Sequence, residues 1–123
     1  MTDGQKPAWF EEVCDWPGVT AGPHRFGGTE FRVNGQEIGH AHGYALVDIP
    51  LPRHQRDEAI ARGKASPHHI HPDSHWVSLR VTDDISAEHA VELLRFNYER
   101  LLRANRNGDR NNGGKPDNSG ARA

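Results

Sequence analysis

Histidine is concentrated in two short stretches of this chain. Six of its nine histidines lie there, His40 and His42 in the first stretch and His68, His69, His71 and His75 in the second. The imidazole side chain changes its charge near neutral pH, and its ring nitrogens also bind transition metals. Two such clusters in a small chain predict a binding or catalytic site built on imidazoles.

Three interpretations fit these clusters. In the first, His40, His42 and His75 work without a cofactor, as acids or bases toward a bound ligand. In the second, the same three histidines bind a divalent metal such as zinc, with His69 or His71 as alternatives to His75, because a His-x-His pair on a strand and a histidine from a neighbouring strand suit metal coordination. In the third, the histidines are hydrogen-bonded structural groups. We expect the first, and we assign the remaining histidines, His24, His54 and His89, to incidental roles.

Other residues near the clusters indicate how a ligand would be held. Arg32 and Arg80 can pair with an anionic group of the substrate. Tyr44 and Trp76 can stack on a ring. Two further histidines, His69 and His71, can line the pocket, and these six residues are the predicted substrate-binding side chains. The nearest acids, Glu37 and Asp48, have a strand parity relative to His40 and His42 that is wrong or undecided for metal coordination. Either acid is a candidate to orient one histidine ring.

The first cluster belongs to a predicted β-hairpin. Residues 29–33 and 36–42 alternate in polarity, and Asn34-Gly35 between them is the strongest short hairpin signal. A two-residue loop predicts the pairs Val33 with Gln36, Phe31 with Ile38, Thr29 with His40, and Gly27 with His42. In this register His40 and His42 share the face of Phe31 and Ile38, and Gly27 leaves room beside His42.

The rest of the chain predicts an α+β fold, with helices packed on one side of a mainly antiparallel sheet and a long C-terminal helix. Helices are expected over residues 8–14, 52–62 and 86–103, the last with Ser86 as its N-cap. Strands are expected over 19–26, 45–51 and 75–81. In the last strand His75 is in phase with the apolar residues Val77, Leu79 and Val81, and Trp76 is on the other face.

Composition sets the domain boundaries and narrows the partners. The 123 residues suit a single domain over residues 1–104, and the polar residues 105–123 are expected to form a disordered tail. A net charge of -2 gives no electrostatic case for nucleic acid or an anionic membrane. The single cysteine, Cys14, allows no intrachain disulfide, and no secretory signal or membrane span is recognised. These features predict a cytoplasmic protein with a small-molecule partner, and they carry no signal for an oligomeric state.

The order of motifs also resembles a known family. The chain resembles the luciferase-domain family in the order of six features. These are Glu37-Ile38-x-His40-x-His42, an apolar strand, a helix, a Pro/His segment, Trp76 on a strand and a last helix with Tyr98. The resemblance covers about Gly18 to Leu102. This family includes small bacterial proteins and the luciferases of bioluminescent fungi. A weaker similarity, through the Pro-x-His segment before a Trp strand, is to the small YjbR-like α+β domains.

The resemblance implies a function in general terms. The fungal enzymes look like cofactor-independent oxygenases that add O2 to a hydroxylated pyrone. By this resemblance the chain would hold a small aromatic or enolic ligand, with His40 or His42 as base on an acidic hydroxyl and Arg32 or Arg80 stabilising the anion. The alternatives are a metal-binding protein, structural or hydrolytic, and a non-catalytic module that senses a ligand or pH.

Overall fold

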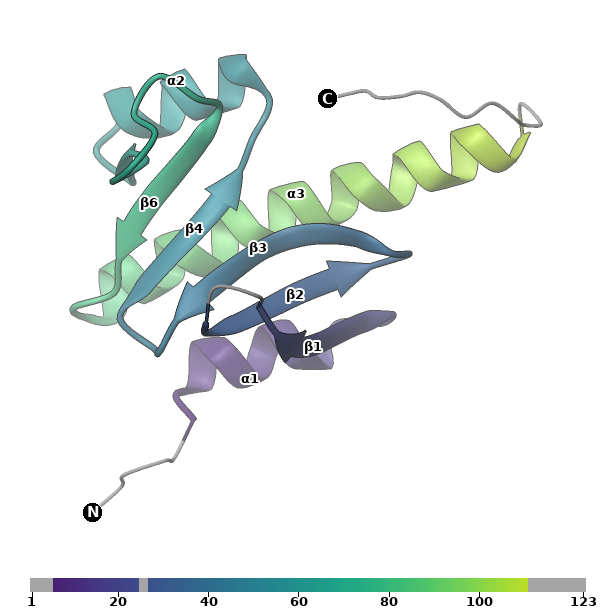
Figure 1. Ribbon diagram of the computed structural model, residues 1–123, viewed down its shortest axis with the longest axis horizontal. Helices are drawn as coiled ribbons and strands as arrows, with labels where there is room; N and C mark the ends of the chain where they lie inside the picture. Colours follow the sequence, from purple (N-terminus) through teal and green to yellow (C-terminus); the bar gives the residue numbers. More distant parts are fainter. Residues whose placement is uncertain (1–5, 25–26, 111–123) are drawn as a thin grey trace.

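A six-stranded antiparallel sheet and three helices make up the fold in a computed structural model, which describes residues 6–24 and 27–110 (Figure 1). The strands stand in the order β1-β2-β3-β4-β6-β5, and each neighbouring pair is antiparallel. The strands are β1 (Val19–Pro23), β2 (Thr29–Val33), β3 (Gln36–His42), β4 (Leu46–Pro50), β5 (Ser66–Pro67) and β6 (Trp76–Arg80). The helices are α1 (Ala8–Asp15), α2 (Arg53–Ala61) and α3 (Asp84–Arg110). The expected α+β class is confirmed.

Helices α1 and α3 cover one face of the sheet and bury the core there (Figure 1). Helix α3 contacts four strands and α1, while α2 contacts β5 and β6 near one edge. Close packing of α3 depends on Gly39, where a Cβ atom would lie 2.8 Å from Leu94 Cδ2 and 2.9 Å from the Asp48 carbonyl oxygen. In the described part of the chain no helix covers the opposite face of the central strands, which is the face that presents the histidines.

The β2–β3 hairpin contains a β-bulge that the sequence did not predict. Asn34 and Gly35 form the turn, both with positive φ, and Val33 pairs with Gln36 as expected. Beyond Arg32 the register shifts by one residue, so that Phe31 pairs with Gly39 instead of Ile38. Ile38 is the extra residue of the bulge. The expected pairs of Thr29 with His40 and of Phe31 with Ile38 are therefore wrong.

The bulge also changes which face the histidines occupy. Ile38 is fully buried in the core, and Gly39 faces Leu94 of α3, so two successive residues belong to the helix-covered side. His40 and His42 then point to the opposite face, not to the face of Phe31 as predicted. Because of the extra residue, Glu37 shares that face with His40, although residues three apart lie on opposite faces of a regular strand.

The glycine beside the first cluster is also one residue away from the expected position. Gly28, with φ of 85°, passes so close to β3 that a Cβ atom would lie 2.2 Å from the Ala41 carbonyl oxygen. A Cβ atom at Gly27, the glycine predicted to lie opposite His42, would meet nothing within 4 Å. Gly28 is therefore the residue whose missing side chain permits the close approach of the two backbones.

Helix α3 differs from its predicted bounds at both ends. It begins at Asp84, and the carboxylate of Asp83 accepts the Ser86 backbone N–H at 2.8 Å, so Asp83 is the N-cap instead of Ser86. The helix continues to Arg110, so residues 105–110 are helical where a tail was expected, and residues 111–123 of that tail lie outside the described residues. Within the described part of the chain, no helix combines the length and the apolar character needed to cross a membrane.

Candidate functional site

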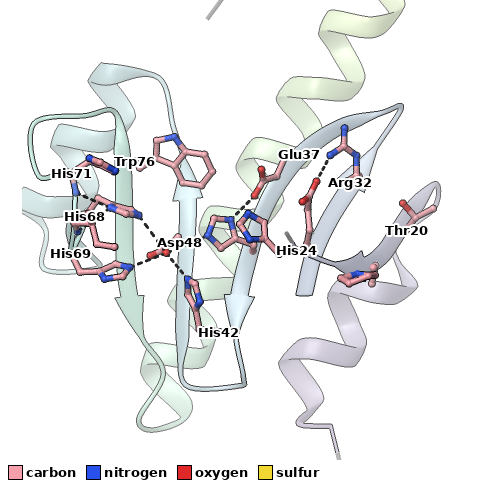
Figure 2. Close-up of a pocket in the computed structure, with 16 residues that line it drawn as sticks. Thr20, His24, Arg32, Glu37, His42, Asp48, His68, His69, His71 and Trp76 are labelled. Atoms are coloured by element: carbon pink, nitrogen blue, oxygen red, sulfur yellow. Dashed lines mark hydrogen bonds and ion pairs between the residues drawn. The ribbon is translucent and has the colours of Figure 1, made fainter. Parts of the chain in front are cut away.

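A pocket of about 1020 Å³ lies on the helix-free face of the sheet (Figure 2). Strands β1 to β4 and β6 supply its floor, and the loop that follows β5 supplies one wall. It is lined by Thr20, Ala21, Gly22, Pro23, His24, Glu30, Arg32, Glu37, His40, His42, Asp48, His68, His69, Ile70, His71 and Trp76. Histidines from both sequence clusters therefore meet in one pocket.

Asp48 is the residue on which these histidines converge. It lies in the middle of β4, paired with His40 of β3 and with Ser78 of β6, and its exposed fraction is 1%. The Ser78 hydroxyl donates a hydrogen bond of 2.7 Å to Asp48 Oδ1. The other carboxylate oxygen, Oδ2, lies 2.9 Å from His42 Nε2, 3.1 Å from His69 Nε2, and 3.4 Å from both His40 Nε2 and His68 Nε2.

These contacts keep the Asp48 carboxyl group ionised. Burial alone would raise its pKa, because a buried charge loses its hydration. Hydrogen bonds with His40, Ser78 and His42, in that order, outweigh burial and hold the pKa of Asp48 well below its usual range. A buried carboxylate at the centre of a sheet is expensive unless it has such partners. The imidazoles and Ser78 therefore also hold the floor of the pocket together.

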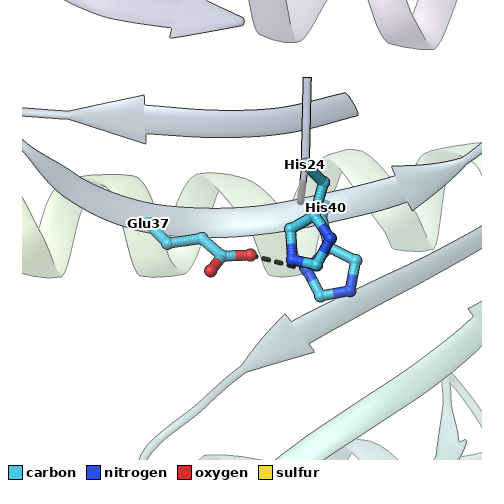
Figure 3. Close-up of side chains that lie close together, drawn as sticks. All are labelled: His24, Glu37 and His40. Atoms are coloured by element: carbon cyan, nitrogen blue, oxygen red, sulfur yellow. Dashed lines mark hydrogen bonds and ion pairs between the residues drawn. The ribbon is translucent and has the colours of Figure 1, made fainter. Parts of the chain in front are cut away.

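His40 lies between two carboxylates. Its Nδ1 is 2.6 Å from Glu37 Oε2 and its Nε2 faces Asp48, while the His24 ring stacks on it at a centroid distance of 4.0 Å (Figure 3). Burial by itself would lower the pKa of His40, but the hydrogen bonds with Asp48 and Glu37 outweigh burial and raise the pKa to about 9. The pair of carboxylates thus favours a positive charge at this position.

His68 has a different role, which its hydrogen bonds determine. Its Nδ1 accepts the backbone N–H groups of Ile70 at 3.1 Å and of His71 at 3.0 Å. A nitrogen that accepts carries no proton, so the proton of the neutral ring is on Nε2 and points to Asp48. Burial, the largest influence, lowers the pKa of His68 and keeps the ring neutral. His68 therefore directs its protonated Nε2 toward the carboxylate, 3.4 Å from Asp48 Oδ2.

Helix α2 holds the loop that brings the second cluster to Asp48. The Arg56 guanidinium donates to the carbonyl oxygens of Pro72 at 2.7 Å and Ser74 at 3.2 Å. Closer to the site, the His69 backbone N–H donates to Ser78 Oγ at 3.1 Å, and Ser78 Oγ in turn donates to Asp48. The loop is thus fixed both to α2 and to the hydroxyl that binds Asp48.

Six of the nine residues predicted for the site line this pocket, and three do not. His40, His42, His69, His71, Arg32 and Trp76 line it. His75, Tyr44 and Arg80 are not among the lining residues. His75 is 3.2 Å from the Leu51 carbonyl oxygen through Nδ1, the Tyr44 ring packs against Phe10 of α1 at 5.1 Å, and Arg80 is exposed at the end of β6. His75 therefore does not complete a metal site with His40 and His42.

The prediction also missed residues that the structure brings into the pocket. Asp48, Glu37, His68 and His24 were not among the predicted site residues, and the first two contact predicted histidines there, Glu37 with His40 at 2.6 Å and Asp48 with His42 at 2.9 Å. A signal for Asp48 was present, because a three-residue turn after His42 pairs His42 with Leu46 and therefore His40 with Asp48. Gly39, next to the extra residue Ile38, was a signal for the bulge that brings Glu37 to His40, because a glycine inside a strand often marks a bulge.

The fold and the pocket define a class of small α+β domain, in which an antiparallel sheet has one helix-covered face and one face that carries clustered histidines around a buried aspartate. A comparison with protein families assigns the chain within that class. The Luciferase domain matches residues 35–97, which is more than half of the 123 residues, and the chain belongs to this family. The matched segment contains every pocket residue of β3, β4, β6 and the loop after β5. No curated protein and no solved structure matches the chain.

Proposed function

We propose that the pocket binds a small planar ligand with an acidic hydroxyl group and that a histidine held by Asp48 removes the hydroxyl proton. The observation that supports this proposal is the pairing of one buried carboxylate with two accessible imidazoles. Asp48 is 1% exposed, whereas the His42 and His69 side chains, at 2.9 and 3.1 Å from it, are each 34% exposed.

A buried carboxylate makes a neighbouring imidazole an effective base. It accepts a hydrogen bond from the N–H group of one ring nitrogen, which leaves the lone pair of the other nitrogen free to take a proton from a ligand. It also stabilises the imidazolium that forms. His42 is the base we propose, because its contact with Asp48 is the shorter of the two, and His69 is the second candidate.

The remaining walls of the pocket favour a planar ligand. Trp76 is half-buried on the pocket face, with its ring centroid 5.3 Å from that of His40. Indole and imidazole rings offer flat surfaces on which an aromatic or enolic ring can stack. A volume of about 1020 Å³ also accommodates a ligand larger than a single ring.

Membership of the Luciferase domain family suggests the reaction that follows ionisation. We propose that the carbon of the resulting enolate adds O2 to form a C–O bond, and that the peroxide takes the proton back from the imidazolium. The ligand and O2 together then account for every atom and electron of the hydroperoxide product. This step rests on the resemblance to O2-using luciferases, and the base rests on the geometry of Asp48.

The test uses the full chain with a hydroxypyrone and a catechol as probe ligands. We expect the anion of the probe to form on binding at a pH below its free pKa, visible as an absorbance shift, and O2 uptake to follow at an electrode. His42→Ala should abolish the shift and the uptake. His54→Ala, which removes an exposed histidine of α2 outside the pocket, should leave both unchanged. Absence of the shift with both probes, or an unaltered shift in His42→Ala, would overturn the proposal.

A further inference from the structure

We infer that Asp48, His40, His42 and His69 form a binding site for one divalent transition-metal ion that faces the pocket. This inference rests on the proposed function only for the identity of the small molecule that the bound ion would contact in the pocket. The site combines ligands from β3, β4 and the loop after β5, and four observations on these side chains support it.

The first observation is crowding around a single oxygen atom. Four imidazole nitrogens lie within 3.4 Å of Asp48 Oδ2, while Oδ1 is engaged with Ser78. A carboxylate has about four lone-pair positions shared between its two oxygens, so about two belong to Oδ2. His42 and His69 fill these two positions with hydrogen bonds, and the His40 and His68 nitrogens lie beyond them at 3.4 Å. A cation bound between Oδ2 and deprotonated nitrogens would use this convergence, because nitrogen and oxygen lone pairs would then point to one centre.

The second observation is the spacing of the ligand atoms. Oδ2 lies 2.9, 3.1 and 3.4 Å from Nε2 of His42, His69 and His40. Nitrogen and oxygen ligands about 2.0–2.2 Å from one ion lie roughly 2.9–3.5 Å from each other in octahedral or tetrahedral geometry. Each of the three histidines thus lies at ligand distance from Oδ2. The ligand atoms of Asp48, His40 and His42 also lie within 4.8 Å of one another, whereas His69 forms a separate group of this kind with Asp48 and His68. The His69 side chain, which is 34% exposed on its loop, must therefore turn toward His40 and His42 to share the ion.

The third observation is the presence of supporting groups behind two of these ligands, His40 and Asp48. A metal-bound histidine usually donates its other N–H to a carboxylate, which fixes the ring and increases its basicity. Glu37 holds His40 Nδ1 in this way at 2.6 Å, and Ser78 holds the free oxygen of Asp48 at 2.7 Å. His68 is a supporting group and not a ligand, because its Nδ1 accepts two backbone N–H groups and its Nε2 keeps the proton.

The fourth observation excludes the neighbouring group of possible ligands. His24, Glu37 and His40 also lie within ligand distance of one another (Figure 3). The rings of His24 and His40 are stacked, 4.0 Å apart and inclined by 26°. Imidazoles bind a metal through lone pairs in the ring plane, so two stacked rings cannot direct those lone pairs to one ion. The ion therefore belongs on the Asp48 side of His40.

The ligand set and its charge indicate which ion is preferred. Three imidazoles and one carboxylate suit zinc, iron(II), manganese or nickel better than magnesium or calcium, which prefer oxygen ligands. Asp48 and Glu37 carry two negative charges, which a divalent ion balances. The ion would acidify a ligand hydroxyl directly, with the proton released to solvent, and His42 would then be a metal ligand in place of a base.

The experiment measures metal binding by the full chain without an affinity tag. Co²⁺ serves as the probe, because its visible absorption reports nitrogen and oxygen coordination, and Zn²⁺ competition gives the affinity. We expect one ion per chain and a loss of affinity of more than about 100-fold in Asp48→Asn and in His69→Ala, exceeding the effect of a supporting residue. His54→Ala should bind Co²⁺ as the unaltered chain does. His69 lies in a loop, so its variant remains informative if circular dichroism shows Asp48→Asn to be unfolded.

The outcomes separate the two proposals. Co²⁺ that does not bind, or that binds equally well to folded His69→Ala and Asp48→Asn, overturns the metal site. If Co²⁺ does not bind and the hydroxypyrone still ionises in the chelator-treated chain, the proposed base stands and the metal site falls. If Co²⁺ binds with one ion per chain and no probe ligand changes its spectrum, the metal site stands and the proposed function falls.

Discussion

The two faces of strands β3 and β4 differ although their residues alternate along the same two segments. Toward α3 these strands present Ile38, Ala41, Val47 and Ile49, all with no exposed surface. Toward the pocket they present His40, His42 and Asp48. One face is closed by helix packing, and the other is left open to a ligand. A substitution on one face should therefore affect stability or binding selectively.

Asp48 is where the two faces interact. It belongs to the open face, yet its exposed fraction of 1% is as low as that of the core residues, because four histidines and Ser78 surround it. Its backbone carbonyl also lies against Gly39, beneath Leu94 of α3. The packed face thus determines the position of the strand that carries the central carboxylate.

The largest effect on stability should come from the helix-covered face. Leu94 is fully buried on α3 and contacts the sheet beside Gly39. Leu94→Ala removes buried methyl groups and leaves a cavity, so the free energy of unfolding should fall by about 2–5 kcal/mol. His42→Ala on the open face should cost about 1 kcal/mol or less. Urea unfolding of both variants measures the contrast, and equal costs would show that the faces are not independent.

A smaller effect is expected from the group that supports His40. Glu37→Gln replaces the carboxylate that holds His40 Nδ1, so the affinity for Co²⁺ should fall by about 10–100-fold, with little change in unfolding free energy. Glu30→Gln is the matched control, because Glu30 lines the same pocket but pairs with Arg32. An equal loss of affinity in the two variants would indicate that only the overall negative charge of the pocket matters.

The loop after β5 should have a weaker influence on the open face. Arg56→Ala removes the hydrogen bonds to the Pro72 and Ser74 carbonyls, and the freed loop must be ordered again to bring His69 to the ion. A loss of about tenfold in Co²⁺ affinity corresponds to about 1.4 kcal/mol, comparable to one hydrogen bond of a charged group. Arg62→Ala, which removes an α2 ion pair with Glu58, should leave the affinity unchanged. If amide hydrogen exchange in the loop is faster in Arg56→Ala but not in Arg62→Ala, the loss of Co²⁺ affinity results from the freed loop.

The elements of the fold were readable from the sequence because their signals are local. Asn34-Gly35 requires two positive φ values and so marks the hairpin, and the apolar stripe of the last helix follows a helical period. The faces of the hairpin were not readable. Ile38 and Gly39 both face the core, where Gly39 lies against Leu94 of α3, a contact between residues far apart in the chain.

The site was predictable to a similar extent. Clustering of histidines identified His40, His42 and His69 as neighbours of one pocket, because residues close in sequence and on one strand face stay together. His75 directly precedes Trp76, so strand alternation places it on the face opposite Trp76, which lines the pocket. The alternation that predicted a core-facing position for His75 therefore also keeps it out of the pocket. His68 reaches Asp48 through a loop whose course is set by side chains of α2, which no local pattern encodes.

The smallest effect should come from the cap of α3, which affects only the helix-covered face. Asp83 accepts the Ser86 N–H, and these bonds with the Ser86 backbone and then its side chain lower the pKa of the Asp83 carboxyl. A lowered pKa means that the cap stabilises the fold above the ordinary aspartate pKa of about 3.9 and loses this contribution as pH falls through the folded value. Asp83→Ala should therefore melt a little below the unaltered chain at pH 7, and the difference should vanish in acid. Calorimetry between pH 2 and 7 measures this convergence. Because the cap does not touch the pocket, Co²⁺ affinity at pH 7 should be the same in both proteins, and a reduced affinity would show that α3 transmits its position to Asp48.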